Sequence, residues 1–260
     1  MGPLEAAWLG IVQGLTEFFP VSSSGHLVIA ETLLGHVGEG VLFEIAVHVG
    51  TLVAILAFYR ERIVSLISGV LAREPEAWRY AGKLVLATLP AVVAGLTAKP
   101  FIESLFGEPR VIVLTLLATG ALLLTIRRTQ PHARAAMPSW PQAFWIGCAQ
   151  MLAIAPGISR SGSTLAAALA LGVAPLAATE FSFLMAVAAI TGAAVLAIPD
   201  ANAADAATLI ACGIGAVTAA VSGLFALRAF VRLLERQRFH FFAYYCFAAA
   251  MAFAAYLSFA

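Results

Sequence analysis

The chain has 260 residues, of which 62% are hydrophobic and 11% are charged, and its mean hydropathy is +0.94. Soluble domains carry about 25% charged residues, so this composition excludes a soluble globular protein and indicates an integral membrane protein. The net charge of +1 and the absence of a basic stripe in the sequence exclude a nucleic-acid partner.

The first apolar stretch, residues 4–30, is interrupted by polar residues. The interruptions are Gln13, Glu17, Pro20, Ser22, Ser23, Ser24 and His26. Irregular backbone at membrane depth is tolerated only when it is buried in protein or lines a wet cavity. We therefore predict a re-entrant helix–loop–helix hairpin here. The segment carries Glu5 and no basic n-region, so a cleaved signal peptide is not predicted.

Three unbroken apolar segments follow, at about 41–59, 83–99 and 109–126, and each can cross a bilayer core as a helix. A second broken stretch, 141–173, contains Pro156, Ser159, Arg160, Ser161 and Ser163, and predicts a second re-entrant hairpin. Three more spans, at about 176–198, 206–228 and 239–260, complete the chain. The predicted fold class is an all-α polytopic membrane protein with six transmembrane helices and two hairpins. The structural alternative has eight spans, with both hairpins crossing fully.

The two broken stretches repeat one another at a constant offset of 137 residues. The matched pairs are Gly10 with Gly147, Gln13 with Gln150, Leu15 with Leu152, Ser22 with Ser159, Ser24 with Ser161 and Gly25 with Gly162. We therefore predict a single membrane domain, 1–260, built from two repeats, 1–130 and 138–260. Repeats with broken helices place a shared site between their hairpins.

Basic residues predict how the spans are oriented. Twelve of the fifteen Lys and Arg residues fall in three stretches: Arg60, Arg62, Arg73, Arg79 and Lys83; Arg127, Arg128 and Arg134; Arg228, Arg232, Arg236 and Arg238. The positive-inside rule places these stretches in the cytoplasm. Both termini and the loops near Glu39, Glu108 and Asp205 then lie outside, and the two repeats have inverted topology.

The first hairpin offers a carboxylate, several hydroxyl groups and an imidazole. Gln13 and Glu17 share a helix face because they are four residues apart, and an intramembrane carboxylate is a functional hypothesis by default. The run Ser22 to Ser24 with Gly25 suits an anion at a helix N-terminus, and helix capping is the alternative role for these serines. His26 can act as an acid, a base or a nucleophile, and a satisfied core histidine is the alternative.

The second hairpin offers a cation surrounded by hydroxyl groups. Arg160 is the only cation in the apolar interior of either predicted hairpin, and its planar guanidinium suits phosphate oxygens. Its neighbours in the sequence are Gly157, Ser159, Ser161, Gly162, Ser163 and Thr164. The alternative role for Arg160 is an ion pair with Glu17 that joins the repeats.

Four polar residues within the spans are weaker candidates. Glu44 and His48 are four residues apart near the outer end of the first full span. Two roles stay open for His48: it borders the site, or it makes an interhelical hydrogen bond. Glu180 is interpreted as interfacial, and Ser222 as a helix-packing residue beside Gly223.

Both hairpin sequences resemble signatures of the undecaprenyl-diphosphate phosphatase family, also called the bacitracin-resistance family. The first signature has Glu or Gln, then Glu four residues later, then Pro, a serine-rich turn and His; here it reads QGLTEFFPVSSSGHL at 13–27. The second has the form PGxSRSxxT and reads PGISRSGST at 156–164. The resemblance covers the whole chain in length and span order. Gln13 stands at the first position, so Glu17 is the only carboxylate of that pair.

The resemblance implies a membrane enzyme that removes the terminal phosphate of undecaprenyl diphosphate, which regenerates a lipid carrier for cell-wall synthesis. It implies dependence on a divalent cation, Mg²⁺ or Ca²⁺, with Glu17 and Gln13 as candidate ligands. It also implies a site in the bacterial inner membrane that opens to the periplasmic face. The expected partners are the polyprenyl diphosphate lipid and the bilayer, and homodimer formation is left open.

Residue roles follow from these observations as predictions. The diphosphate-binding residues are expected to be Ser24, Gly25, Gly157, Ser159, Arg160, Ser161 and Thr164. Glu17 would hold a cation or a water, and His26 would be the general base or the nucleophile. Ser22 is a rival nucleophile with His26 as its base. A transporter or flippase of a polyprenyl phosphate is the competing function, since inverted repeats with broken helices are also a transporter architecture.

Overall fold

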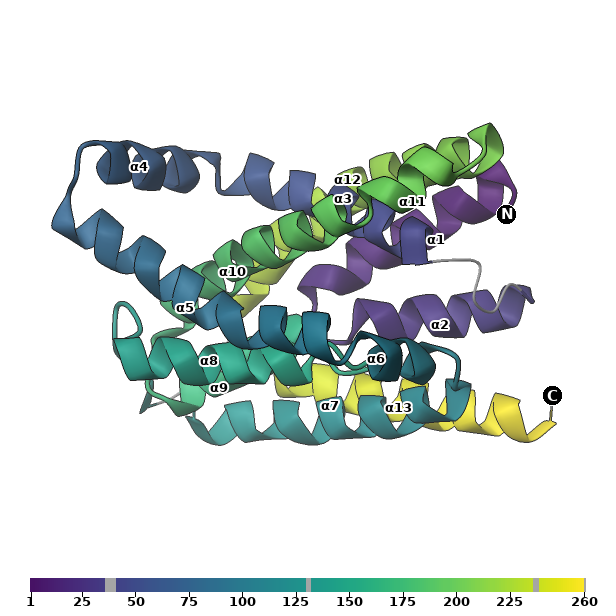
Figure 1. The fold of residues 1–260 in the computed structure, drawn as a ribbon. Coiled ribbons are helices and arrows are strands. Elements are labelled where there is room, and N and C mark those ends of the chain that lie inside the picture. The colour runs from purple at the N-terminus through teal and green to yellow at the C-terminus, as the bar shows by residue number, and fades with distance from the viewer. Residues whose placement is uncertain (36–40, 130–131, 236–238, 260) are drawn as a thin grey trace.

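In the computed structural model, residues 1–35, 41–129, 132–235 and 239–259 are described, and they fold into helices joined by short connections (Figure 1). Six helices are long and apolar enough to cross a membrane. They are α3 (Val41–Phe58), α5 (Pro75–Thr97), α7 (Pro109–Thr129), α10 (Pro175–Leu196), α12 (Ala206–Glu235) and α13 (His240–Phe259). They match the six predicted spans, which confirms an all-α polytopic membrane protein.

Two pairs of shorter helices occupy the broken stretches. They are α1 (Pro3–Phe18) with α2 (Ser23–Leu34), and α8 (Trp140–Leu152) with α9 (Arg160–Ala170). A helix of 11 to 16 residues is about 16–24 Å long, which is less than the roughly 30 Å of a bilayer core. In Figure 1, α1 runs inward from the N-terminus and α2 runs back towards the same end of the molecule. The ends of the second pair also meet, because the Gln142 amide donates to the Leu171 carbonyl oxygen over 2.7 Å.

Three further helices lie between the spans, where the sequence had indicated loops: α4 (Arg60–Leu71), α6 (Lys99–Phe106) and α11 (Ile198–Ala203). The predicted start of the second span, at 83, is also too late. Helix α5 begins at Pro75, a residue type suited to the first turn of a helix. The prediction left out the first turns of α5 because Arg79 and Lys83 are charged. In the structure these residues are helical, and the Lys83 ammonium lies 6.0 Å from the centre of the Trp140 ring. Charge at the membrane boundary therefore did not end this helix.

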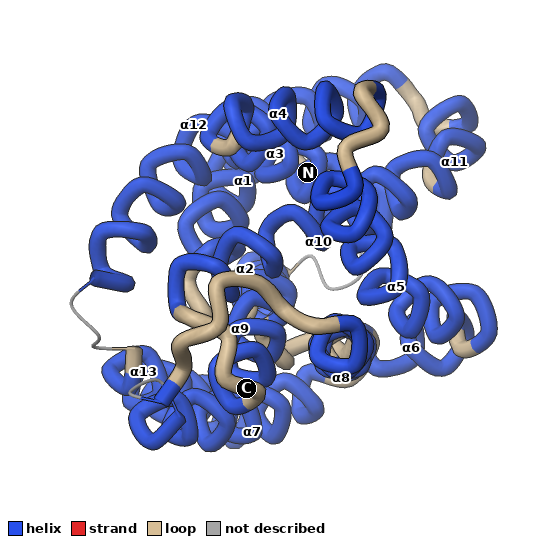
Figure 2. The backbone as a smooth tube through the Cα atoms, turned by 90° about the vertical axis from the view of Figure 1, so that its left-hand side faces the viewer, coloured by secondary structure: helices blue, strands red, loops and turns tan. Residues whose placement is uncertain are grey.

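The two short pairs are held by spans from the opposite half of the chain. Helix α1 packs against α12, and α8 packs against α5, while α10 contacts α3 and α5. Figure 2 shows α2 and α9 in the middle of the molecule, with α1 and α10 on one side and α7 and α8 on the other. The breaks in both short pairs therefore lie inside the helix bundle.

Close backbone approach holds α3 and α1 on α12. A Cβ atom at Gly50 of α3 would lie 2.1 Å from the Ala216 carbonyl oxygen, and one at Gly10 of α1 would lie 2.3 Å from the Gly215 carbonyl oxygen. Such distances leave no room for a side chain, so these glycines allow the helices to pack tightly, as small residues do in membrane proteins.

The N-terminus of α12 is capped in the connection after α11. The Asp205 side chain accepts a hydrogen bond from the Thr208 N–H over 2.8 Å. Hydrogen bonds from the Thr208 hydroxyl and N–H hold the pKa of Asp205 below its ordinary value, because they favour the ionised carboxylate. A charged carboxylate is thus stable at this end of the helix.

Candidate active site

The break between α1 and α2 touches the break between α8 and α9. The Gly157 N–H donates to the Ser24 hydroxyl over 3.3 Å, and the Ser161 hydroxyl donates to the Phe19 carbonyl oxygen over 3.3 Å. A Cβ atom at Gly25 would lie 3.0 Å from the Gly157 Cα. Polar segments more than 130 positions apart in the chain therefore share one interior location.

At this location Glu17 of α1 pairs with Arg160 of α9. The Arg160 Nη2 lies 2.5 Å from Glu17 Oε1, and both side chains are largely buried, at 17% and 6% exposure. Arg160 Nη1 also donates to the Ser182 carbonyl oxygen of α10 over 3.2 Å. The ion pair with Glu17, which the sequence left open as the alternative role of Arg160, is formed, and it connects three helices from both halves of the chain.

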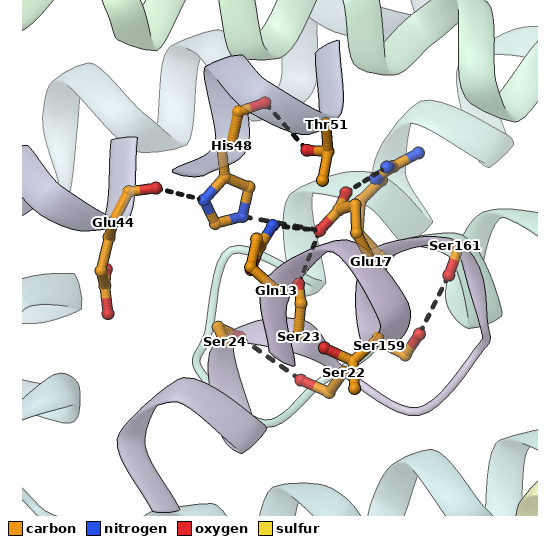
Figure 3. A network of polar contacts seen from close by, with 12 residues as sticks. Gln13, Glu17, Ser22, Ser23, Ser24, Glu44, His48, Thr51, Ser159 and Ser161 are labelled. Atoms are coloured by element: carbon orange, nitrogen blue, oxygen red, sulfur yellow. Dashed lines mark hydrogen bonds and ion pairs between the residues drawn. The ribbon is translucent and has the colours of Figure 1, made fainter. Parts of the chain in front are cut away.

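The second carboxylate oxygen of Glu17 contacts three further polar side chains (Figure 3). Glu17 Oε2 accepts hydrogen bonds from the Ser23 hydroxyl over 2.6 Å and from the Gln13 amide nitrogen over 3.1 Å. His48 Nε2 lies 3.6 Å from the same oxygen. Glu17 therefore joins α1, α2, α3 and α9 at one point.

The orientation of His48 is set by its own helix. Its Nδ1 lies 2.7 Å from the Glu44 carbonyl oxygen, and a carbonyl can only accept, so Nδ1 carries the hydrogen. Nε2 is thereby directed at Glu17. His48 therefore borders the site, and because its contact with Glu17 runs from α3 to α1, the contact is also interhelical.

Ser23 is a site residue that the sequence reasoning did not single out. The backbone of Ser22 is in the left-handed region, with φ 68°, and α2 begins directly after it. A non-glycine residue there is strained, and such strain concentrates at functional sites. The Ser22 hydroxyl caps α2 by accepting the Gly25 N–H over 3.3 Å, while the next residue places its hydroxyl on Glu17. The local backbone therefore places the Ser23 hydroxyl, rather than the Ser22 hydroxyl, against the Glu17 carboxylate.

The second break is held in a similar manner. Ser159, predicted to bind the diphosphate, caps α9 by accepting the Gly162 N–H over 3.0 Å, as Ser22 caps α2. Gly157 has φ +85°, and a Cβ atom there would lie 1.9 Å from the Thr115 hydroxyl oxygen. Thr119 of α7 donates to the Gly157 carbonyl oxygen over 3.0 Å and accepts the Ser159 N–H over 3.1 Å. Glycine at 157 is required by both its φ and its surroundings.

Thr164, predicted to bind the diphosphate, is fully buried between α9 and α10. Its hydroxyl lies 2.6 Å from the Ser182 hydroxyl and donates to the Arg160 carbonyl oxygen over 2.8 Å. The Thr164 hydroxyl thus links α9, which carries Arg160, to Ser182 of α10. The carbonyl oxygen of the same Ser182 accepts a hydrogen bond from Arg160.

His26 makes a separate set of contacts. Its Nδ1 lies 2.7 Å from the Ser22 carbonyl oxygen and its Nε2 lies 2.8 Å from the Tyr245 hydroxyl of α13. The predicted pairing of a Ser22 nucleophile with His26 as its base is not formed. The His26 ring contacts the main-chain carbonyl of Ser22, and the Ser22 hydroxyl caps α2 instead. Glu17 and Arg160 therefore belong to one contact network, and His26 belongs to another on the far side of Ser22 in the chain.

The predicted cation ligands, Gln13 and Glu17, do not form a metal site in this arrangement. Glu17 already receives a guanidinium and two uncharged donors, and the Gln13 amide nitrogen, not its oxygen, faces the carboxylate. Gln13 Oε1 is a buried acceptor without a hydrogen-bond partner among the described residues. The described part of the chain also contains no group of three or more His, Cys, Asp or Glu residues that could hold a metal ion. A single amide oxygen beside a neutralised carboxylate does not fit the oxygen-rich coordination of Mg²⁺ or Ca²⁺.

The profile of the family described as bacitracin resistance protein BacA matches residues 6–252. The chain belongs to this family. Similar proteins include the undecaprenyl-diphosphatase of Desulfosudis oleivorans, at 39% identity over 95% of this chain and 96% of the relative. The undecaprenyl-diphosphatase of Rhodopirellula baltica is 40% identical over 94% of this chain and 93% of its own length. Undecaprenyl-diphosphatase 3 of Acinetobacter baylyi is 34% identical, with 94% and 95% covered. These BacA relatives carry an enzyme name, and no comparison supports the transporter alternative.

Proposed function

We propose that this BacA family member is an undecaprenyl-diphosphatase, and that the Glu17–Arg160 centre is its active site. Family membership and the names of relatives that match over nearly their whole length support the activity. The observation that carries the location is the convergence of an acid, a guanidinium and a serine hydroxyl at two touching helix breaks. The reaction converts undecaprenyl diphosphate and water to undecaprenyl phosphate and inorganic phosphate.

The terminal phosphate is bound by the N-terminal ends of α2 and α9 together with Arg160. The first N–H groups of a helix and its dipole favour an anion. These ends bring Ser24, Gly25, Gly157, Ser159 and Ser161 around the break. Arg160 is the first residue of α9, so its guanidinium lies where the charge of the helix end is most positive. Phosphoryl transfer depends mainly on such positioning and electrostatic stabilisation.

Ser23 is the nucleophile of the proposal, and Glu17 is its base. The hydroxyl of Ser23 already donates to Glu17 over 2.6 Å, which is the contact that an activated serine requires. Its oxygen forms a bond to the terminal phosphorus, its proton passes to Glu17, and the bond from phosphorus to the bridging oxygen breaks. Undecaprenyl phosphate leaves, and water then cleaves the phosphoserine to release phosphate. Arg160 opposes the charge that develops on the phosphoryl oxygens.

The remaining predicted residues support this centre. Ser22 caps α2 and maintains the backbone that directs Ser23. His26, on the first turn of α2, is assigned to proton transfer with the water that cleaves the phosphoserine. A divalent cation is proposed to arrive on the diphosphate oxygens of the substrate, because Mg²⁺ is commonly bound through substrate phosphates. No step depends on it here.

The membrane setting is also part of the proposal. We infer that α1–α2 and α8–α9 are re-entrant hairpins of two inverted repeats in the bacterial inner membrane, with the site open to the periplasmic face. Their short helices and the crossed packing of α1 on α12 and α8 on α5 support this inference. The polyprenyl tail would then extend sideways into lipid.

Replacement of individual serines tests the assignment. Ser23→Ala should lower phosphate release from undecaprenyl or farnesyl diphosphate to the level of Glu17→Gln, at least about a hundredfold, because both lose the activated nucleophile. Ser22→Ala is the matched control and should retain a substantial fraction, since it loses the cap of α2 and the contact with Ser24 but keeps the Ser23 hydroxyl. The measurement is phosphate released by detergent-purified protein. The reverse order of the two serine variants would refute the role of Ser23, and near-normal turnover of Glu17→Gln would refute the active site.

A further inference from the structure

Helix α13 contacts His26 of α2 through Tyr245, a residue that the proposed chemistry does not use. Tyr245 stacks on His26 with ring centres 5.5 Å apart and an angle of 8° between the rings. Its hydroxyl lies 2.8 Å from His26 Nε2. The two residues are 219 positions apart, so the contact joins the beginning and the end of the chain.

The hydrogen bonds of His26 define its tautomer. Nδ1 lies 2.7 Å from the Ser22 carbonyl oxygen, which can only accept, so Nδ1 must carry a hydrogen. In the neutral ring Nε2 is then an acceptor, and the Tyr245 hydroxyl donates to it. When Nε2 gains a proton, the same hydroxyl can rotate and accept. A tyrosine hydroxyl therefore serves both protonation states of the ring without moving its oxygen.

The position of Tyr245 is fixed by packing of α13 on the break itself. Phe242, one turn earlier, stacks on Phe19 with ring centres 5.4 Å apart, and the Cys246 thiol lies 3.9 Å from the Pro20 carbonyl oxygen. The second break is held by α7 through an equivalent contact, in which Thr119 donates to the carbonyl oxygen of Gly157. Pro20 and Gly157 are separated by the 137-residue offset of the repeat. One membrane-spanning helix therefore contacts each break: α13 contacts the first and α7 contacts the second.

We infer that Tyr245 is a positioning residue of the active site: its hydrogen bond to Nε2 holds the His26 ring in one orientation, with Nε2 as the atom that takes up or releases the proton. The inference rests on the role given to His26 in the proposed function. Tyr245 is 48% exposed, so this contact lies at the periphery of the helix bundle. Helix α13 thereby contributes to a site whose charged residues all come from other helices.

The test removes the hydroxyl and keeps the ring. Tyr245→Phe preserves stacking on His26, and Tyr256→Phe is the control, since Tyr256 is on the same helix and stacks on Phe253 instead. The first measurement is the ¹⁵N spectrum of histidine side chains in the full-length protein in nanodiscs, with His26→Gln to assign the signals. We expect the unprotonated Nε2 signal of His26 to shift in Tyr245→Phe and to stay unchanged in Tyr256→Phe.

The second measurement is steady-state phosphate release. Tyr245→Phe should lower kcat about tenfold, a part of the 10²–10⁴ that a proton-transferring side chain supplies, while KM changes less than about twofold because Arg160 is untouched. An unshifted Nε2 signal, or a shifted signal with unchanged kcat, overturns the positioning role. If His26→Gln keeps wild-type turnover while the Nε2 signal responds to Tyr245→Phe, the proposed role of His26 fails and the contact itself stands.

Discussion

At the scale of single residues, Glu17 explains how a carboxylate can be stable inside this membrane protein. An ionised group at membrane depth is costly unless it is paired and hydrogen-bonded. Glu17 is 6% exposed and meets Arg160, Ser23, Gln13 and His48. Each partner comes from a different position in the site, so loss of one leaves the others in place. Loss of Arg160 differs from loss of the other partners. Ser23 and Gln13 are uncharged and His48 is charged only when protonated, so Arg160 alone among these partners is always positively charged.

Removal of Arg160 should therefore have the largest single effect on catalysis. Arg160→Ala is expected to slow phosphate release at least about a hundredfold, or roughly 3 kcal/mol, because it also leaves Glu17 as an unpaired buried charge. Arg160→Lys should rescue poorly, since one ammonium cannot contact Glu17, the Ser182 carbonyl and a phosphate as a planar fork can. Turnover by purified variants, compared at equal folded protein by size-exclusion chromatography, measures both. Full activity of the lysine variant would contradict the guanidinium requirement.

At the residue scale the sequence was informative where polar groups interrupt apolar runs. Gln13, Glu17 and Arg160 stand out for that reason, and the structure places them in contact. The choice between Ser22 and Ser23 could not be read from the sequence. It depends on one backbone angle, φ 68° at Ser22, which sets where each hydroxyl points.

At the scale of helices, the packing of α3 and α1 on α12 depends on positions without side chains. Gly50 lies against the Ala216 carbonyl, and Gly14 would place a Cβ atom 2.1 Å from the Ser222 hydroxyl oxygen. Ser222 is therefore a packing residue, as the sequence suggested. Because α3 carries His48 and α1 carries Glu17, the close approach of these helices to α12 also determines the distance between the two side chains.

Gly50→Ala is expected to destabilise the protein. The added methyl group must displace backbone of α12, and overpacking of this kind costs about 1–3 kcal/mol. The variant should show a lower Tm in detergent and a reduced rate of phosphate release, because the shift of α3 moves His48 away from Glu17.

Gly213→Ala of α12 is the matched control for Gly50→Ala. A Cβ atom at Gly213 has no neighbour within 4 Å among the described atoms, and alanine favours the helix. Its Tm should equal or exceed that of the wild type. If both variants have the same Tm, tight packing at Gly50 is not what holds α3 on α12.

Helix boundaries show what an apolar pattern can and cannot predict. The six spans were located because each is longer and more apolar than a soluble helix. The start of α5, eight residues before the predicted position, was missed because Arg79 and Lys83 are polar but helical. The contact between Tyr245 and His26 could not be anticipated, since nothing in either local sequence indicates a partner 219 positions away.

At the scale of the whole molecule, the two termini lie at the same end of the structure, and α4 lies at the other (Figure 1). This arrangement agrees with a membrane orientation in which the basic stretches share one side. The repeat assignment stays a prediction, supported by packing contacts that occur in pairs, such as α1 with α12 and α8 with α5.

Single-cysteine labelling tests the orientation. In a variant without Cys148, Cys212 and Cys246, cysteines at Glu108 and Asp205 should react with an impermeant reagent added outside, and those at Arg73 and Arg134 only after permeabilisation. The loops near Glu39 and Arg236, which belong to the same prediction, lie outside the described residues. An outside-accessible Arg134 position, or termini on opposite sides, would contradict the inverted repeats.

The distance of 143 positions between Glu17 and Arg160 also sets an order of events during biosynthesis. Chains grow by about 5–20 residues per second, so roughly 7–30 s separate the synthesis of the carboxylate from that of its guanidinium. Ser23 and His48 are synthesised early in this interval, whereas α12, on which α1 packs, is synthesised only after it. The first half must therefore wait in the membrane in an incomplete form. The ion pair that defines the site cannot form before Arg160, the first residue of α9, has been synthesised.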